Sequence, residues 1–322
     1  MASRHRGFLE CVNGLRYCSQ ERLFHRDGET NARDARATRQ QAAHAPFQSR
    51  FGAFMFRPMP ELAEVEYFRR RWNAGIEHRV VRIAMHAGKR IFRGTDARSL
   101  RQQLTGTRLL SSEARGKRML FRFSNENWLG LHLGMSGRMQ TAGPDFHPQK
   151  HDHLVLYQRE RALVFTDPRQ FGRVQFDHRA TAPDWWENGV PEIESGKFDR
   201  EFLDRFLNRH RKAPIKAVVL MQSGFSGIGN WMADEILWRA KILPSKRAGR
   251  LNAEERNQLF RATKFVARES LRIIGPDDSK LPRSWLIHQR WNAGGKCPRH
   301  KILLRRATIG GRTTAWCPKC QK

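Results

Sequence analysis

The sequence predicts an α+β protein: an antiparallel β-sandwich or barrel is followed by helices and then by a cysteine-rich β-hairpin. Three observations support this order. Residues 80–176 hold short apolar or alternating runs separated by Gly, Pro, Asn and Asp, which is typical of antiparallel strands. After Asp184 the apolar residues take helical spacing. Near the C-terminus, two pairs of Cys or His residues flank a Gly-Gly turn.

The composition indicates what kind of partner to expect. Lys and Arg total 60 of the 322 residues against 31 Asp and Glu, a formal net charge of +29. Such a field favours a polyanion such as nucleic acid, although other basic proteins, for instance ribosome-associated ones, share it. The chain is long enough for two domains, and no apolar run approaches the roughly 20 residues of a membrane span.

The cysteines divide the chain. Cys11 and Cys18 lie in the first 58 residues, the other three lie near the C-terminus, and the long middle has none. This usage argues against a disulfide framework and predicts a reducing compartment, hence a cytoplasmic location.

Residues 1–58 differ in character from the rest, with 10 Arg, no Lys and no sustained helical or strand period. The segment could be an organellar transit peptide, but its five acidic residues count against that. It could be a disordered DNA-binding arm, or an artefact upstream of a true start at Met59. We favour the last because of the sequence that follows.

From Met59 the chain reads MPELAEVEYFRRRWNAG, which predicts an amphipathic helix. Pro60 suits a first helical turn, the glutamates favour the N-terminal end, and Gly75 is a natural stop.

Three polar phrases stand between the expected strands: ARGKRML, LGMSGRM and DPRQFG. They contain Lys117, Met135, Arg169 and Phe171. Taken singly they are weak signals, because a loop Lys is usually solvated and a Met or Phe is usually in the core.

In the helical part, GFSGIGNWMADEILWRAKILP has glycines between two helices, with Asn230 at the expected N-cap of the second. A helix N-terminus fronted by glycines offers free N–H groups to a phosphate, so a helix–turn–helix-like DNA clamp is one reading. A helical hairpin that needs Gly for close packing is the other.

The C-terminus carries the strongest signal. Two pairs spaced C-x2-H-x16-C-x2-C fit tetrahedral zinc, and the basic hairpin between them would suit contact with DNA. His300 is the least secure ligand, since it could be a surface histidine. The expected ligands are Cys297, His300, Cys317 and Cys320.

These phrases occur in the order found in one family. Residues 59–322 resemble the formamidopyrimidine-DNA glycosylase family, which includes the endonuclease VIII enzymes. The shared motifs are MPELAEVE, RGK, LHLGMSG, DPRQFG, GIGNWMADEILWRAKILP and GGRTTAWCPKCQ. The resemblance implies an N-terminal antiparallel β-sandwich flanked by helices (59–180), a helix–two-turn–helix DNA-binding domain (181–280) and a zinc finger (281–322), after a leader at 1–58.

The resemblance also implies a chemistry. Once the initiator Met is removed, Pro60 would attack the damaged nucleotide, expel the base and form a Schiff base, and β,δ-elimination would then break the strand. Glu61 matches the acid/base that protonates the ribose oxygen, and Lys117 a lysine that contacts phosphate near the lesion. Asn230 and Arg312 match phosphate-binding residues.

The remaining implications concern DNA. Met135, Arg169 and Phe171 match a trio that fills the gap left by the everted nucleotide. The expected partner of a single, monomeric chain is damaged duplex DNA near the nucleoid, and the expected cofactor is one structural Zn²⁺.

Four departures from the family pattern stand out. Ala63 replaces a proline, Gln170 an arginine and His300 a cysteine. Residues 275–297 are shorter than their counterpart, which in the purine-specific branch carries a loop over 8-oxoguanine. The gap-filling trio nevertheless favours oxidised purines, with an oxidised-pyrimidine glycosylase of the endonuclease VIII type as the alternative.

Two other classes stay open. If Pro60 remained within a peptide bond, its nitrogen could form no imine, and the chain would be a non-catalytic protein that binds damaged DNA. Such a protein would have no need of the retained Pro60, Glu61 and Lys117. A zinc-finger transcription factor is the weaker reading, because a single finger would have to confer sequence specificity.

Overall fold

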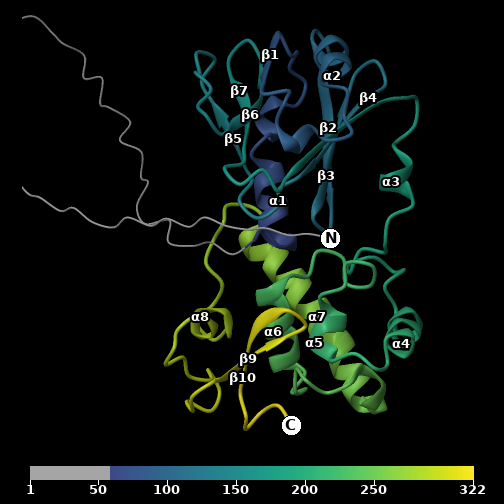
Figure 1. Ribbon diagram of the computed structural model, residues 1–322, viewed down its shortest axis with the longest axis vertical. Coiled ribbons are helices and arrows are strands. Elements are labelled where there is room, and N and C mark those ends of the chain that lie inside the picture. The colour runs from purple at the N-terminus through teal and green to yellow at the C-terminus, as the bar shows by residue number, and fades with distance from the viewer. Residues whose placement is uncertain (1–58) are drawn as a thin grey trace, which may run out of the picture. The chain divides into compact units, whose positions relative to one another are not determined.

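The computed structural model describes residues 59–322, so the expectations for residues 1–58 lie outside it. Two four-stranded antiparallel sheets form the N-terminal part (Figure 1). One has the order β1-β6-β7-β5 and the other β2-β3-β4-β8. The strands are β1 (Arg82–Met85), β2 (Leu109–Arg115), β3 (Arg118–Phe123), β4 (Asn127–His132), β5 (Arg138–Ala142), β6 (Asp152–Tyr157), β7 (Ala162–Thr166) and β8 (Arg173–His178).

The two sheets share one apolar core, so the arrangement is a sandwich, as the sequence predicts. Phe121 of β3 and Leu131 of β4 lie in the same buried cluster as Leu156 of β6 and Phe165 of β7. Alternating strands place one face inward, and burial of that face supplies the main driving force for pairing the sheets.

Helix α1 (Leu62–Arg70) connects this sandwich to the helical part. Val65 enters the core of the sandwich, whereas Ala63 lies in the core of the helical part. Glu61 is the N-cap and forms a reciprocal capping box with Glu64, which confirms the predicted helix. Its bounds correct the prediction: Pro60 precedes the N-cap instead of lying in the first turn, and the helix ends at Arg70, before the expected stop at Gly75. The other short helices here are η1 (Asn73–Gly75), η2 (Arg90–Phe92), α2 (Ala97–Leu104) and α3 (Asp184–Glu187).

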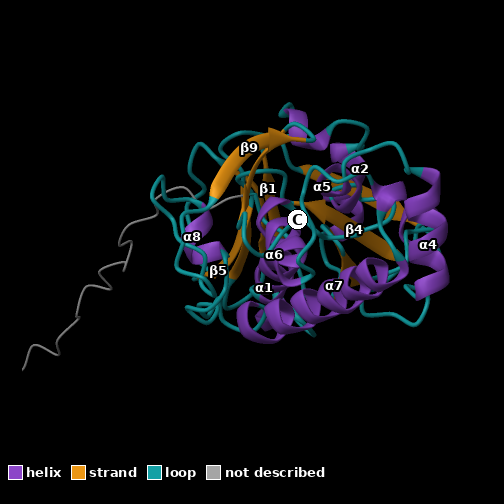
Figure 2. Ribbon diagram, turned by 90° about the horizontal axis from the view of Figure 1, so that it is seen from below, coloured by secondary structure: helices purple, strands orange, loops and turns teal. Residues whose placement is uncertain are grey.

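In the helical part, α6 packs beside the long helix α7 (Figure 2). It also contacts strand β10 of the C-terminal hairpin. One detail of the sequence prediction was wrong: Asn230 is the first residue of α6, and the N-cap is Gly229. The prediction also missed α7, which starts with a capping box between Asn252 and Glu255. The elements are α4 (Arg200–Arg209), α5 (Ile215–Val219), α6 (Asn230–Arg239), η3 (Ala248–Arg250), α7 (Ala253–Ile274) and α8 (Ile287–Arg290).

The C-terminal hairpin pairs β9 (Arg305–Ile309) with β10 (Arg312–Trp316) in antiparallel register. Gly310 and Gly311 both adopt positive φ, 61° and 72°, as a two-residue type I′ turn requires. The predicted hairpin is therefore confirmed. Among residues 59–322, no helix is long and apolar enough to cross a membrane.

Candidate functional site

The carboxylate of Glu61 is seated on the N-terminus of α6. It accepts hydrogen bonds from the backbone N–H groups of Gly229 (3.0 Å), Trp231 (2.9 Å) and Met232 (3.0 Å). These are donors that a helix leaves without intrahelical partners, and the helix dipole favours a negative charge there. Only 1 % of Glu61 is exposed. Residue 61 is thereby fixed against residues some 170 positions later in the chain.

Lys117 reaches the same place from the turn between β2 and β3. Its Nζ donates to the carbonyl oxygen of Ile228 (3.1 Å), one residue before the N-cap of α6. The turn packs closely there, because a Cβ on Gly116 would lie 2.1 Å from Ser226 Oγ. Pro60 is buried and directly precedes Glu61. The structure thus gathers the three residues expected to carry the chemistry.

The electrostatics of this cluster favour proton transfer. Burial raises the pKa of Glu61, and the nearby charge of Lys117 offsets part of that rise. Burial also lowers the pKa of Lys117, while Glu61 opposes the shift. Both shifts favour the uncharged form of the side chain, and an acid that donates a proton must first hold one.

Glu64 is a second acid beside Glu61 and is half-buried, and sequence reasoning missed it. Its Oε2 accepts the backbone N–H of Glu61 (3.2 Å), and its Oε1 accepts the indole N–H of Trp231 (3.1 Å). Burial, together with the charge of Glu61, raises the pKa of Glu64 to about 7. The motif contained the signal: an acid three residues after the helix N-cap.

Asn230 and Arg312 lie at the junction between α6 and the hairpin. Asn230 Nδ2 donates to the carbonyl oxygen of Thr313 (3.0 Å), which ties the first residue of α6 to β10. Arg312 is exposed at the start of β10, and its charge helps to lower the pKa of Lys117. An exposed cation and a half-buried amide beside a helix N-terminus suit an anion.

The loops that carry Met135, Arg169 and Phe171 are fastened to each other. The buried carboxylate of Asp167 accepts hydrogen bonds from Ser136 Oγ (2.6 Å) and from the backbone N–H of Gly172 (2.7 Å). The structure therefore brings the loop of residues 133–137 against the loop of residues 167–172.

The trio itself is partly open to solvent. Phe171 is 42 % exposed, Met135 is half-buried, and the Arg169 guanidinium lies 4.8 Å from the centre of the Phe171 ring. An exposed aromatic residue stacked with an arginine offers a surface for a planar base.

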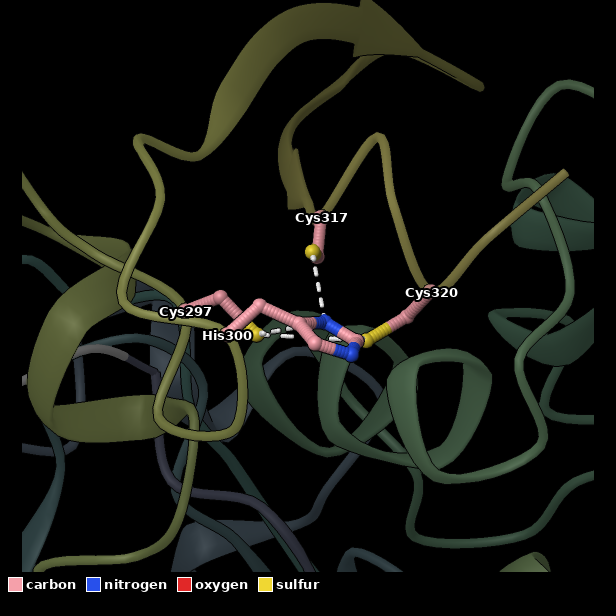
Figure 3. Close-up of side chains that lie close together, drawn as sticks. All are labelled: Cys297, His300, Cys317 and Cys320. Atoms are coloured by element: carbon pink, nitrogen blue, oxygen red, sulfur yellow. Dashed lines mark hydrogen bonds between the residues drawn. The ribbon is translucent and has the colours of Figure 1, made fainter.

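The four expected zinc ligands converge (Figure 3). His300 Nδ1 lies 3.0 Å from Cys320 Sγ, 3.6 Å from Cys317 Sγ and 3.9 Å from Cys297 Sγ. The sulfurs of Cys297 and Cys320 are 3.9 Å apart. Zinc bonds of about 2.3 Å to sulfur and 2.0 Å to nitrogen imply tetrahedral edges of about 3.5 to 3.8 Å. The donor set and its size fit a zinc ion.

Sequence reasoning also missed a buried charge network of Lys216, Asp234 and Arg290, which connects α6 to α5 and α8. Asp234 of α6 contacts Lys216 of α5 and Arg290 of α8, and all three side chains are buried. A signal was present for Lys216 and Asp234, since each is a charge within an apolar helical run. For Arg290 the local sequence gives no comparable signal.

Comparison with known proteins identifies the two larger parts. The family model for the formamidopyrimidine-DNA glycosylase N-terminal domain matches residues 59–174, and the model for the H2TH domain of the same enzymes matches residues 190–278. Formamidopyrimidine-DNA glycosylases of Desulfitobacterium hafniense and Pelotomaculum thermopropionicum are each 32 % identical. Both alignments cover 82 % of this chain, with 100 % and 99 % of the respective relatives.

Solved structures agree. A Lactococcus lactis enzyme in complex with DNA that contains an oxidised pyrimidine has a TM-score of 0.73 and 27 % identity. A variant of the same enzyme with DNA that contains Fapy-dG has a TM-score of 0.72 and 28 % identity. Each match covers 82 % of this chain and 100 % of the other.

Proposed function

Because the chain belongs to the formamidopyrimidine-DNA glycosylase family, we propose that it is a bifunctional DNA glycosylase that excises oxidised bases and then nicks the strand. The observation that carries the proposal is the cluster of Pro60, Glu61 and Lys117 at the N-terminus of α6. A binding protein would have no use for a buried acid and a lysine next to a potential N-terminal amine.

The first step is a displacement at C1′ of the damaged nucleotide. The lone pair of the Pro60 nitrogen forms a bond to C1′ as the glycosidic bond breaks. The base leaves with the bonding electrons and takes up the proton that the Pro60 nitrogen releases. Glu61 then donates its proton to the ribose ring oxygen. The ring opens, and nitrogen and C1′ become an iminium, the Schiff base.

Strand cleavage follows from the electron demand of the iminium. Loss of a C2′ proton expels the 3′ phosphate, and a second elimination along the sugar expels the 5′ phosphate. Lys117 would hold a phosphate beside the reacting sugar, where a cation stabilises the charge of the leaving group. Hydrolysis of the imine returns the amine of Pro60.

This mechanism requires a free amine at Pro60, because an amide nitrogen has no available lone pair. We propose that the active form begins at Pro60, after translation from Met59 and removal of that Met, or after equivalent processing. The family model begins its match at residue 59, and the alignment with the full length of the Desulfitobacterium hafniense relative covers 82 % of this chain, which supports this reading.

The proposed partner is damaged duplex DNA, bound in the cytoplasm by a single chain. Residues 59–322 hold 50 Lys and Arg against 26 Asp and Glu, a net charge of +24, which supports it. The similar Lactococcus lactis enzyme also binds DNA in its solved complexes. Asn230 and Arg312 would bind phosphate. Met135, Arg169 and Phe171 would fill the gap left by the flipped nucleotide. The proposed domains are the β-sandwich (59–180), the helix–two-turn–helix domain (181–280) and the zinc finger (281–322).

Oxidised purines are the proposed lesions, on the strength of the gap-filling trio. Oxidised pyrimidines are the second candidate, because residues 275–297 are short.

The four-ligand cluster would hold one Zn²⁺, which when bound cross-links the base of the finger and leaves the chemistry to the protein. The indole N–H of Trp238 donates to Cys297 Sγ (3.4 Å) and would stabilise the thiolate.

The test is Pro60→Gly in a chain translated from Met59, assayed on duplexes with a single oxidised base. We expect strand cleavage to fall by at least about a hundredfold, the scale of losing a nucleophile, while DNA affinity is kept. Undiminished cleavage would reject Pro60 as the nucleophile. Tight binding without cleavage by the unaltered chain would favour the non-catalytic alternative.

A further inference from the structure

The charge network of Lys216, Asp234 and Arg290 contains more basic than acidic side chains. Asp234 Oδ1 accepts from Lys216 Nζ (2.5 Å), and Asp234 Oδ2 accepts from Arg290 Nε (2.8 Å) and Nη2 (2.6 Å). The side chains of Lys216 and Asp234 are fully buried, and that of Arg290 is 1 % exposed. The network contains two cations and one anion, so it is not a simple neutral pair.

The network extends directly to the hairpin. Arg290 Nη2 donates to the carbonyl oxygen of Thr313 (3.2 Å), the same atom that accepts from Asn230 Nδ2 (3.0 Å). Asp234 Oδ2 accepts the backbone N–H of Ala315 (3.1 Å). The Thr313 carbonyl and the Ala315 N–H of β10 are thus both hydrogen-bonded to side chains of α6, and Arg290 contacts both Thr313 and Asp234.

Stability alone is a weak reason for such an arrangement. Buried ion networks often contribute no more than apolar side chains of the same volume. This one also carries a cost, because Arg290 Nη1 and Asn230 Oδ1 are buried without hydrogen-bond partners. Its distinctive property is geometric: the planar guanidinium fixes Asp234 and Thr313 at set distances from one another.

We propose that Arg290 is a positioning residue for DNA binding: it holds the Thr313 carbonyl so that Asn230 and Arg312 meet the same DNA phosphate. Arg312 directly precedes Thr313 on β10, and Asn230 shares its carbonyl, so a shift of that atom moves both groups. Arg290 itself is buried and touches no DNA. The inference rests on the proposed function, in which Asn230 and Arg312 bind phosphate.

The experiment measures DNA affinity at several salt concentrations, with a duplex that holds a stable abasic-site analogue. Each phosphate contact contributes about 0.9 to the slope of log Kd against log salt. We expect Arg290→Gln to lower that slope by about one contact and to raise Kd roughly tenfold, as losing a phosphate contact does. Single-turnover cleavage of a duplex with one oxidised base, at saturating concentration, should stay near the unaltered rate, because the chemistry is untouched.

Arg290→Lys separates positioning from burial of charge. A lysine keeps a cation beside Asp234 but has no fork to reach Thr313 as well, so we expect the same loss of slope. Arg290→Lys also tests the proposal if the Arg290→Gln variant does not fold. Arg256→Gln is the matched control, since it breaks another arginine–aspartate pair, with Asp204, on α4 and α7. Its salt slope should not change.

Arg312→Ala tests the premise separately. If it lowers the slope and both Arg290 variants leave the slope unchanged with zinc retained, the positioning role is overturned and the phosphate site stands. If Arg312→Ala leaves the slope unchanged, the phosphate role of Arg312 fails, and the inference falls with it. The proposal is supported if Arg290→Gln, Arg290→Lys and Arg312→Ala each lower the salt slope. The Arg290→Gln, Arg312→Ala double variant should then lower the slope no further than either single variant.

Discussion

At the scale of single residues, the site depends on where buried acids are placed. Glu61 is an N-cap of its own helix, yet its carboxylate satisfies three donors of another helix, α6. That contact could not be predicted from local pattern, because the residues involved are some 170 positions apart. The motif resemblance identified Glu61, and geometry explains the direction of its pKa shift: burial raises the pKa, and the charge of Lys117 and the backbone N–H donors offset part of the rise.

Glu64 gives a prediction at the same scale. Its pKa rises from about 4.5 to about 7, so the folded protein keeps a proton that the unfolded chain releases. The stability contributed by this group is complete below pH 4.5 and is lost as the pH rises to about 7.

We therefore expect Glu64→Gln to make the free energy of unfolding less dependent on pH between about 4.5 and 7. Urea unfolding across this range measures it. Glu160→Gln, which removes an exposed carboxylate, is the control for charge alone. An unaltered pH dependence in the Glu64 variant would contradict a raised pKa at this residue.

At the scale of elements, the strands and the hairpin were predictable because their signals are local. Alternation in the strands and Gly310-Gly311 in the turn decide the structure within a few residues. The N-cap of α6 was predicted one residue too late. Gly229, with an extended backbone, is the N-cap, and the side chain of Asn230 contacts the hairpin instead. Arg290 was not found, because only the fold brings it to Asp234.

Gly116 in the β2–β3 turn has a matched control in Gly106, which lies between α2 and β2. Gly116 and Gly106 both have positive φ, 61° and 85°, so alanine strains either one by about 1 kcal/mol. Only at Gly116 would the Cβ clash, at 2.1 Å from Ser226 Oγ, whereas nothing lies within 4 Å at Gly106.

We expect Gly116→Ala to be the more destabilising variant and to slow strand cleavage, since the turn must move and carry Lys117 away from Ile228. Gly106→Ala should cost stability alone. Thermal unfolding and single-turnover cleavage measure the two effects. Equal cleavage rates in both variants would show that the packing of this turn does not position Lys117.

The finger base gives a prediction about metal content. We expect His300→Ala to lower bound zinc well below one ion per chain, because three ligands remain. Elemental analysis of the purified protein is the measurement. His288→Ala is the control, since His288 hydrogen-bonds the carbonyl oxygen of Leu281 outside the cluster. Full zinc content in the His300 variant would remove that residue from the ligand set.

At the scale of the whole molecule, function depends on contacts between parts that fold around separate cores. The sandwich supplies Lys117, the helical part supplies the N-terminus of α6, and the finger supplies Arg312. Sequence motifs marked each contributor, but their convergence follows from long-range packing that no local pattern encodes. Residues 1–58 have no role in the proposed mechanism, since the chemistry needs the nitrogen of Pro60 to be a free amine.

The most direct test of the central claim is borohydride trapping on a duplex that contains 8-oxoguanine, with the full reading frame expressed in its host. Reduction converts a Schiff base into a stable protein–DNA adduct, whose mass reports the N-terminus of the protein. We expect an adduct whose protein begins at Pro60. Absence of an adduct from a chain translated from Met59, with DNA binding intact, would contradict the claim that Pro60 is a catalytic nucleophile.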